Sequence, residues 1–148
     1  MYKKIVVTLD GSKLAECVFP HVKALAETCA VKQIVFVRVV EPLQPFSESF
    51  ALSESMIKKI SVEHEQEAKK YLKEVLEKNK FEGIDVQAQV LVGKIPESII
   101  KFVKKHNMQL ILIATHGRSG IGIFMLGSIA DRILRSSPVP VLMVRAPR

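Results

Sequence analysis

The sequence predicts a single α/β domain on an open, doubly wound, Rossmann-like parallel sheet of five strands, with helices on both faces. Short apolar runs alternate with segments of helical periodicity along the whole chain. The inner strand-like runs are almost continuously apolar, as in parallel strands that helices cover on both faces. The length of 148 residues suits one domain, so residues 1–148 are expected to fold as one unit.

The N-terminal part of the chain predicts strand, helix and strand in that order. Residues 5–9 form an apolar run that stops at a polar turn at 10–12, and apolar positions at helical spacing follow over 14–26. Pro20 lies inside this helix, where it lacks a backbone donor and crowds the preceding turn, so we expect a kink or a displaced first turn. Residues 34–40 are apolar except for one arginine, which predicts a buried strand.

The rest of the chain continues this alternation. Residues 41–53 hold two prolines and no clear period, which predicts an irregular excursion, either a lid or a long crossover. Residues 55–79 predict a long amphipathic helix, and the alternating residues 86–91 predict a half-exposed strand at a sheet edge. Helix, strand, helix and strand are then expected at 96–105, 110–114, 127–135 and 139–144. A βα unit repeated four times and closed by a fifth strand predicts right-handed crossovers.

The net charge of +7 comes from the C-terminal third of the chain. Residues 98–148 hold eight basic and one acidic side chain, whereas residues 1–97 hold 14 of each sign. Such an excess favours an anionic partner: a phosphate group, a nucleic acid or an anionic membrane. Nucleic acid is the least favoured, because only nine aromatic residues are present to supply stacking sites.

Membrane and secretion signals are not found in the sequence. No run approaches the ~20 apolar residues of a membrane-spanning helix. The N-terminus enters a strand-like run without a cleavage signal. We therefore expect a cytoplasmic protein that does not associate with membranes.

Polar residues and glycines gather after two of the predicted strands. Asp10 to Ser12 follow the first strand, and Thr115 to Gly117 follow the fourth. In an open parallel sheet a ligand binds beyond the carboxyl ends of the strands, so both clusters face one crevice if these strands are neighbours. The carboxylate of Asp10 needs donors there, either the amides of its own turn or the hydroxyls of a ligand.

The expected ligand loop is the glycine-spaced stretch 114–128. Its backbone donors can approach an anion closely, and Gly127 with Ser128 opens a helix whose N-terminal amides favour phosphate. Ser128 could add a hydroxyl donor or bind a phosphate-bound metal. In the structural alternative the glycines only form a tight turn and Ser128 only caps the helix. His116 and Arg118 likewise could contact the ligand or be ordinary solvated side chains.

Other nucleotide and catalytic motifs do not match. The spacing from Gly122 to Ser128 approaches that of a Walker A loop, but the lysine that would neutralise the phosphates is absent. The glycines also fail the spacing of a dinucleotide fingerprint. No HxxxH, CxxC or GxSxG pattern suggests a metal site or a catalytic triad.

Residues 5–12, 114–128 and 139–144, with the five-strand pattern between them, resemble the universal stress protein family over essentially the whole chain. The ATP-binding signature of that family reads Gly, two residues, Gly, nine residues, Gly, then Ser or Thr. In this chain it falls on Ala114, Gly117, Gly127 and Ser128, so Ala114 replaces the first glycine and adds a methyl group beside the nucleoside. The resemblance implies an adenine nucleotide alpha hydrolase-like fold with strand order 3-2-1-4-5.

The resemblance also implies a binding site. Asp10 and the backbone of Val39 would hold the nucleoside. The residues implied along the ribose are Ala114, Thr115, His116 and Gly117. Those implied around the phosphates are Arg118, Ser119, Gly120, Gly127 and Ser128. The ligand would be ATP or another adenine nucleotide, with Mg or Mn as an accompanying ion whose protein ligands are not assigned.

The function that follows is a nucleotide-binding stress-response or signalling protein with little or no hydrolysis. No catalytic base accompanies the loop, so the chain is at most a slow ATPase and no catalytic residue is assigned. The alternative is a dimeric interaction module of the same fold that binds no nucleotide, an interpretation that Ala114 favours. By the same resemblance, a homodimer forms through the fifth strand, where Val139, Val141 and Val144 would leave an apolar rim.

Overall fold

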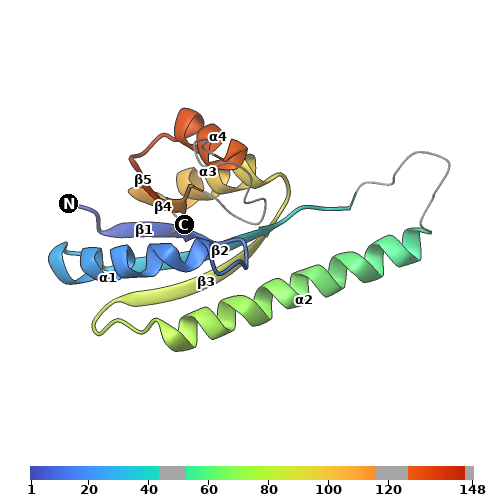
Figure 1. Ribbon diagram of the computed structural model, residues 1–148, viewed down its shortest axis with the longest axis horizontal. Helices are drawn as coiled ribbons and strands as arrows, with labels where there is room; N and C mark the ends of the chain where they lie inside the picture. Colours follow the sequence, from blue (N-terminus) through green and yellow to red (C-terminus); the bar gives the residue numbers. More distant parts are fainter. Residues whose placement is uncertain (44–52, 116–126, 146–148) are drawn as a thin grey trace.

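The computed structural model describes residues 1–43, 53–115 and 127–145. It forms a five-stranded sheet in the order β3-β2-β1-β4-β5, with every neighbouring pair parallel. The elements are, in chain order, β1 (Lys4–Thr8), the 3-10 helix η1 (Ala15–Val18), α1 (Phe19–Thr28), β2 (Gln33–Val40), α2 (Glu54–Lys78), β3 (Asp85–Val92), α3 (Ile95–His106), β4 (Leu110–Ala114), α4 (Ser128–Ser136) and β5 (Val141–Val144) (Figure 1). The predicted fold class and strand order are confirmed.

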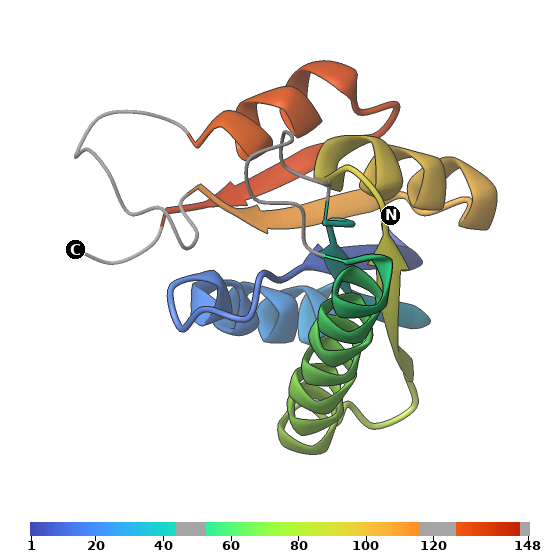
Figure 2. The ribbon, with the colours of Figure 1, turned by 90° about the vertical axis from the view of Figure 1, so that its right-hand side faces the viewer.

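The helices cover the sheet from two sides. Helices α1 and α2 lie on one face, and α3 and α4 lie on the other (Figure 2). Successive residues of β1 point to opposite faces, so Ile5 and Val7 pack in the core under α1 and α2 whereas Val6 packs under α3 and α4. Both sides of the inner strands are therefore buried, which explains their continuous apolar sequence.

Pro20 displaces the start of the first helix, as expected. The predicted helix over 14–26 is divided into the short 3-10 turn η1 and the α-helix α1, which begins at Phe19. Pro20 thus lies in the first turn of α1, where its missing N–H has no intrahelical partner to lose. Because α1 begins only at Phe19, the residues between β1 and α1 form the turn and η1.

Helix α2 is only partly buried along its length. Its residues Ala68, Leu72 and Val75 belong to the core, but Met56 is 51% exposed. The beginning of α2 extends past the ends of the strands (Figure 1). The N-terminal part of the predicted apolar stripe is therefore not covered by the described residues. None of the helices described is long and apolar enough to cross a membrane.

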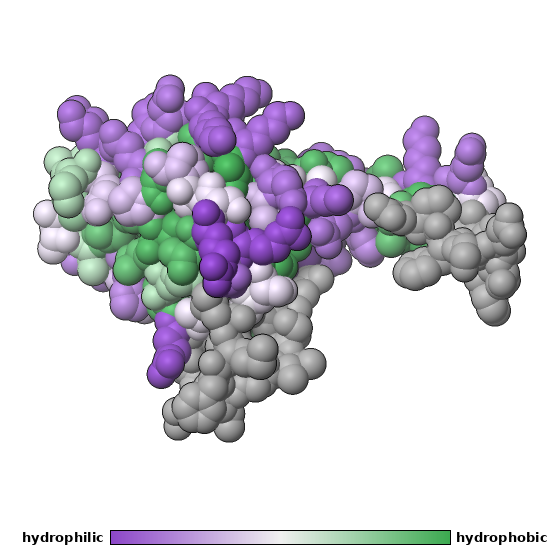
Figure 3. All heavy atoms as spheres, turned by 90° about the horizontal axis from the view of Figure 1, so that it is seen from above, coloured by the Kyte–Doolittle hydropathy of each residue, from purple (hydrophilic) through white to green (hydrophobic). Residues whose placement is uncertain are grey.

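Part of the basic excess of the C-terminal third lies on the outer surface of α3 and α4. Lys101, Lys104, Lys105 and Arg132 line a hollow between these helices, and Arg132 pairs with Glu97 at 2.6 Å. Hydrophilic side chains cover much of the face seen in Figure 3, with apolar side chains visible beside them. These basic residues are separate from the carboxyl ends of the strands.

Candidate functional site

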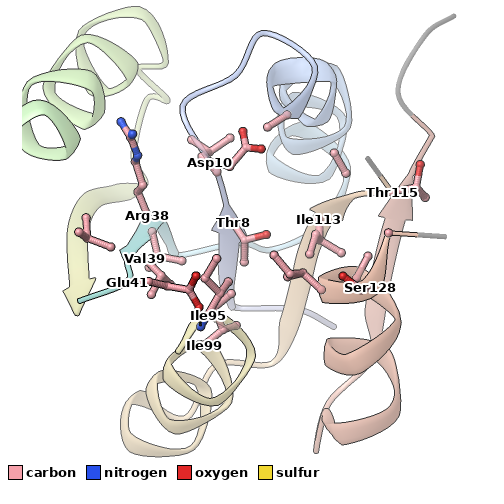
Figure 4. Close-up of a pocket in the computed structure, with 18 of the residues that line it drawn as sticks. Thr8, Asp10, Arg38, Val39, Glu41, Ile95, Ile99, Ile113, Thr115 and Ser128 are labelled. Carbon is pink, nitrogen blue, oxygen red and sulfur yellow. Dashed lines mark hydrogen bonds between the residues drawn. The ribbon is translucent and has the colours of Figure 1, made fainter. Parts of the chain in front are cut away.

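A cavity of about 490 Å³ lies at the carboxyl ends of β1, β2 and β4. Six of the residues predicted from the sequence line it: Asp10, Val39, Ala114, Thr115, Gly127 and Ser128. The other five, His116, Gly117, Arg118, Ser119 and Gly120, lie outside the described residues. Figure 4 shows Val39 and Glu41 on one side of the cavity, Thr115 and Ser128 on the other, and Thr8 and Asp10 between them.

Pairing between β1 and β4 brings the two polar clusters together. The register runs from Ile5 opposite Leu110 to Val7 opposite Leu112, so the carboxyl ends of both strands reach the same edge of the sheet. The hydroxyl of Thr8 also donates to the carbonyl oxygen of Leu112 at 3.3 Å. Asp10 from the first cluster and Thr115 from the second thus both line the cavity, as the expectation of one shared crevice requires.

The turn after β1 is held by hydrogen bonds to Asp10. Its Oδ1 accepts from the amide of Ser12 at 2.8 Å and from the hydroxyl of Ser12 at 2.6 Å. The Ser12 hydroxyl oxygen in turn accepts from the amide of Ala15 at 3.2 Å, at the start of η1. The turn therefore supplies donors to one carboxylate oxygen of Asp10 and fixes the side chain at the mouth of the cavity.

A close backbone contact joins the end of β4 to the start of α4. The amide of Gly127 donates to the carbonyl oxygen of Thr115 at 3.1 Å. A Cβ added to Gly127 would lie 2.9 Å from that same oxygen, so a larger residue does not fit there without a backbone shift. Gly127 is the N-cap of α4 and Ser128 is its first helical residue. The alternative in which Ser128 serves only as the helix cap is wrong, since the N-cap is Gly127.

The apolar part of the cavity was not predicted from the sequence. Beyond Val39 and Ala114, the apolar side chains that line it are Leu9, Ala15, Val37, Val40, Ile95, Ile99, Ile113, Ile129 and Ala130. Helix α2 contributes His64 and Glu67 to the lining. The residues from α2 and α3 lie on crossover helices distant in sequence from the glycine loop, and no local motif marks them.

Arg38 is the residue of β2 that sequence reasoning could have identified. It interrupts an otherwise apolar strand, is 6% exposed and lines the cavity. Its Nη2 lies 3.5 Å from Oε1 of Glu67, and its Cζ lies 5.4 Å from the ring centre of Tyr71. A charge buried in a strand needs such partners. A single arginine within an apolar strand therefore indicates, from the sequence alone, that other segments of the chain supply them.

Tyr71 links this arginine to the other side of the β1 turn. Its hydroxyl donates to Oε1 of Glu16 at 3.3 Å, and Oε2 of Glu16 pairs with Lys13 at 3.0 Å. Burial, followed by the charge of Glu16 and the hydrogen bond to it, raises the pKa of Tyr71 well above its ordinary value. Tyr71 is therefore a neutral donor at physiological pH.

The charges that line the cavity are mostly acidic on the β1 and β2 side. Asp10, Glu41 and Glu67 lie there with Arg38. Oε1 of Glu41 accepts from the amide of Ile95 at 3.4 Å, in the first turn of α3, where a carboxylate complements the helix dipole. On the opposite side lies the N-terminus of α4, whose dipole favours anions. Within the described part of the chain, no group of His, Cys, Asp and Glu could hold a metal ion.

The sequence profile of the universal stress protein family matches residues 1–145. The chain belongs to this family. Universal stress protein MJ0531 of Methanocaldococcus jannaschii is 31% identical, over 100% of this chain and 85% of that protein. Universal stress protein MJ0577 of the same organism is 29% identical, over 98% of this chain and 96% of its own length.

Solved structures agree with this family membership. The structure of MJ0577 superposes with a TM-score of 0.86 at 26% identity, covering 100% of this chain and 99% of that one. A universal stress protein in complex with cAMP has a TM-score of 0.60 at 19% identity, covering 99% and 98%. An Arabidopsis thaliana member with AMP bound has a TM-score of 0.63 at 14% identity, covering 98% and 92%. For the cAMP-bound and AMP-bound structures, whose sequence identities are 19% and 14%, the likeness shows the fold alone.

Proposed function

We propose that this protein binds an adenine nucleotide in the cavity at the carboxyl ends of β1, β2 and β4, as a stress-response or signalling protein. The observation that carries the proposal is the convergence of Asp10, Val39, Ala114 and Ser128 on one cavity. These residues come from four separate elements or turns, and the resemblance of the sequence to the family implies all four of them as site residues. The volume of about 490 Å³ falls in the range typical of small-molecule sites.

The two sides of the cavity favour one orientation of the nucleotide. The nucleoside packs on the apolar side made by Val37, Val39 and Ile99, and the phosphates lie toward Ser128 at the start of α4. The acidic side chains near β2 repel a phosphate, whereas the amides of a helix N-terminus attract it. The hydroxyl of Ser128 would then contact a phosphate or a phosphate-bound Mg or Mn.

The relatives support an adenine ligand. One structural neighbour carries cAMP and another carries AMP, so adenosine with a single phosphate is what the two ligands share. For this chain we propose AMP or ATP, with His116 and Gly117 beside the ribose and Arg118 to Gly120 around the phosphates. We further propose that hydrolysis is slow or absent, because the loop sequence has neither the lysine of a P-loop nor an evident catalytic base.

Isothermal titration calorimetry of nucleotide-stripped protein tests this proposal. AMP and ATP, with and without millimolar magnesium, are expected to bind, and GMP is expected to bind more weakly. Ser128→Ala should weaken binding of AMP and ATP while leaving binding of adenosine unchanged, since the hydroxyl serves the phosphate. Absence of binding for every adenine ligand contradicts the proposal. A steady-state ATPase assay on the same preparation separates binding from turnover.

We also propose a single-domain subunit that forms a homodimer through β5, at the edge of the sheet. Val139 and Val141 are half-buried in the single chain, so part of each side chain can contribute to an apolar rim at this edge. Val144, expected on that rim, is only 6% exposed because it packs in the core beneath α1 and α2. Sedimentation velocity should give a dimer that Val139→Glu weakens, and a wild-type monomer at micromolar concentration contradicts this proposal.

A further inference from the structure

Arg38 is a buried cation placed between three segments of the chain. Its side chain extends from β2 toward α2 (Figure 4), where it meets Glu67 and the ring of Tyr71. The side chain of Arg38 is 8% exposed and that of Glu67 is 64% exposed. Glu67 therefore compensates the charge of Arg38 from the solvent side. The third segment that the guanidinium meets is the turn after β1.

Gly11, in the middle of this turn, lies directly against the guanidinium group. A Cβ added to Gly11 would lie 2.8 Å from Cζ and 2.9 Å from Nη1 of Arg38. Gly11 also has a φ of +86°, a backbone conformation that residues other than glycine rarely adopt. Glycine therefore suits this position both for its backbone conformation and because Arg38 occupies the space of a Cβ.

The residues on either side of Gly11 carry the hydrogen bonds that fix Asp10. Both donors to Oδ1 of Asp10 come from Ser12, so a shift of Gly11 moves the donor and the acceptor relative to each other. The guanidinium group fills the space beside Gly11 toward which a Cβ would point. A continuous set of contacts therefore runs from α2, through Glu67 and Arg38, to the turn that presents Asp10 to the cavity.

We propose that Arg38 is a positioning residue for ligand binding: it holds the Asp10–Ser12 turn in place and thereby sets the carboxylate of Asp10 toward the ligand. The part that concerns the ligand rests on the proposed function. The planar guanidinium can lie flat against Gly11 and pair with Glu67 at once, which a lysine ammonium cannot do. The effect of Arg38 on binding is therefore transmitted through Asp10.

A double-mutant cycle on AMP affinity tests this transmission. Arg38→Met, of similar length and without charge, should weaken AMP binding about tenfold in the wild-type background. The same substitution should have less than about a twofold effect in the Asp10→Ala background, because the carboxylate to be positioned is gone. Arg38→Lys should lie between Met and wild type. Arg135→Met, which removes a surface arginine, is the matched control and should bind AMP like wild type.

Fold-changes in affinity that multiply independently for Arg38→Met and Asp10→Ala would overturn the proposal. That result means that Arg38 contacts the ligand itself or affects stability alone. If wild-type protein binds neither AMP nor ATP, the proposed function fails, and the ligand part of the inference fails with it. A stability experiment that needs no ligand tests the contact between Gly11 and Arg38 separately.

That experiment compares alanine at two glycines with left-handed backbone. Gly83 has a φ of +72° and no atom within 4 Å of an added Cβ, so Gly83→Ala measures the backbone effect alone. Gly11→Ala should lower the Tm by several degrees more than Gly83→Ala. In an Arg38→Ala background this excess should disappear, because the guanidinium is no longer there. An excess that persists without Arg38, or no excess in the wild-type background, contradicts the positioning role.

Discussion

Two glycine turns border the cavity, and they differ in what approaches the glycine. At Gly11 the neighbour is the side chain of Arg38, 2.8 Å from an added Cβ, whereas at Gly127 it is the backbone oxygen of Thr115, at 2.9 Å. A side chain can rotate away from a larger residue. The Thr115 oxygen cannot retreat without losing its hydrogen bond to the Gly127 amide. A larger residue at Gly127 therefore meets fixed backbone, whereas one at Gly11 meets a movable side chain in addition to its strained positive φ.

The strongest test of this difference is Gly127→Val. The added side chain should push α4 away from Thr115, destabilise the protein by about 1–3 kcal/mol and abolish measurable AMP binding. Thermal unfolding and calorimetry, at a temperature where circular dichroism shows folded protein, provide the measurements. Ser128→Ala, one residue further, is the control and should lower AMP affinity by less than about tenfold. Wild-type affinity in Gly127→Val would show that the contact does not shape the site.

A smaller effect is expected on the other side of the cavity, from Asp10→Ala. This change removes the acceptor for the amide and the hydroxyl of Ser12, and should destabilise the protein by about 1 kcal/mol. Asp10→Asn keeps a side-chain oxygen for the Ser12 amide and should lose less stability. Denaturant titration of both variants measures the difference. Equal losses would mean that the turn does not depend on these hydrogen bonds.

Tyr71, beside the β1 turn, predicts a pH dependence of the stability of the protein. Because the native state raises the pKa of Tyr71 above its ordinary value of 10.0, native protein holds this proton after the unfolded chain has released it. The free energy of unfolding should therefore fall as the pH rises above about 10. Tm values between pH 8 and pH 11 should decline less in Tyr71→Phe than in wild type.

Tyr2→Phe is the matched control for this alkaline effect and should follow the wild-type curve. Tyr71→Phe also removes the hydrogen bond to Glu16, so its Tm at neutral pH provides the baseline from which the decline is measured. Parallel declines in wild type and Tyr71→Phe would exclude Tyr71 as the titrating group.

The smallest effect is expected from Ala114→Gly, which restores the first glycine of the family signature. Ala114 is 8% exposed and lines the cavity, so removing its methyl group should cost about 0.5–1 kcal/mol of stability. AMP affinity should rise modestly if the methyl group crowds the nucleoside. Calorimetry of both proteins with AMP measures this change, and a lower affinity would show that the methyl group packs favourably on the ligand.

Much of the candidate site was predictable because its residues adjoin glycines or strand ends. Asp10 follows β1, Gly127 caps α4 and Ser128 begins it, and local sequence predicts turns and helix starts at such positions. His64, Glu67 and Ile99 were missed because they enter the cavity from the middle of crossover helices. Helical periodicity predicts which side of a helix is apolar, but it does not predict which residues reach the edge of the sheet.

By itself, the sequence determined the order of the elements and the burial of the inner strands, because apolar periodicity is a local property of the chain. It also placed glycines at both turns beside the cavity. Only the tertiary structure decided why each is needed, since Arg38 and Thr115 approach them through strand pairing and helix packing. The contact of the Arg38 guanidinium with Gly11 and the hydrogen bond between Gly127 and Thr115 both join residues that are distant in the sequence. Local sequence patterns therefore do not predict them.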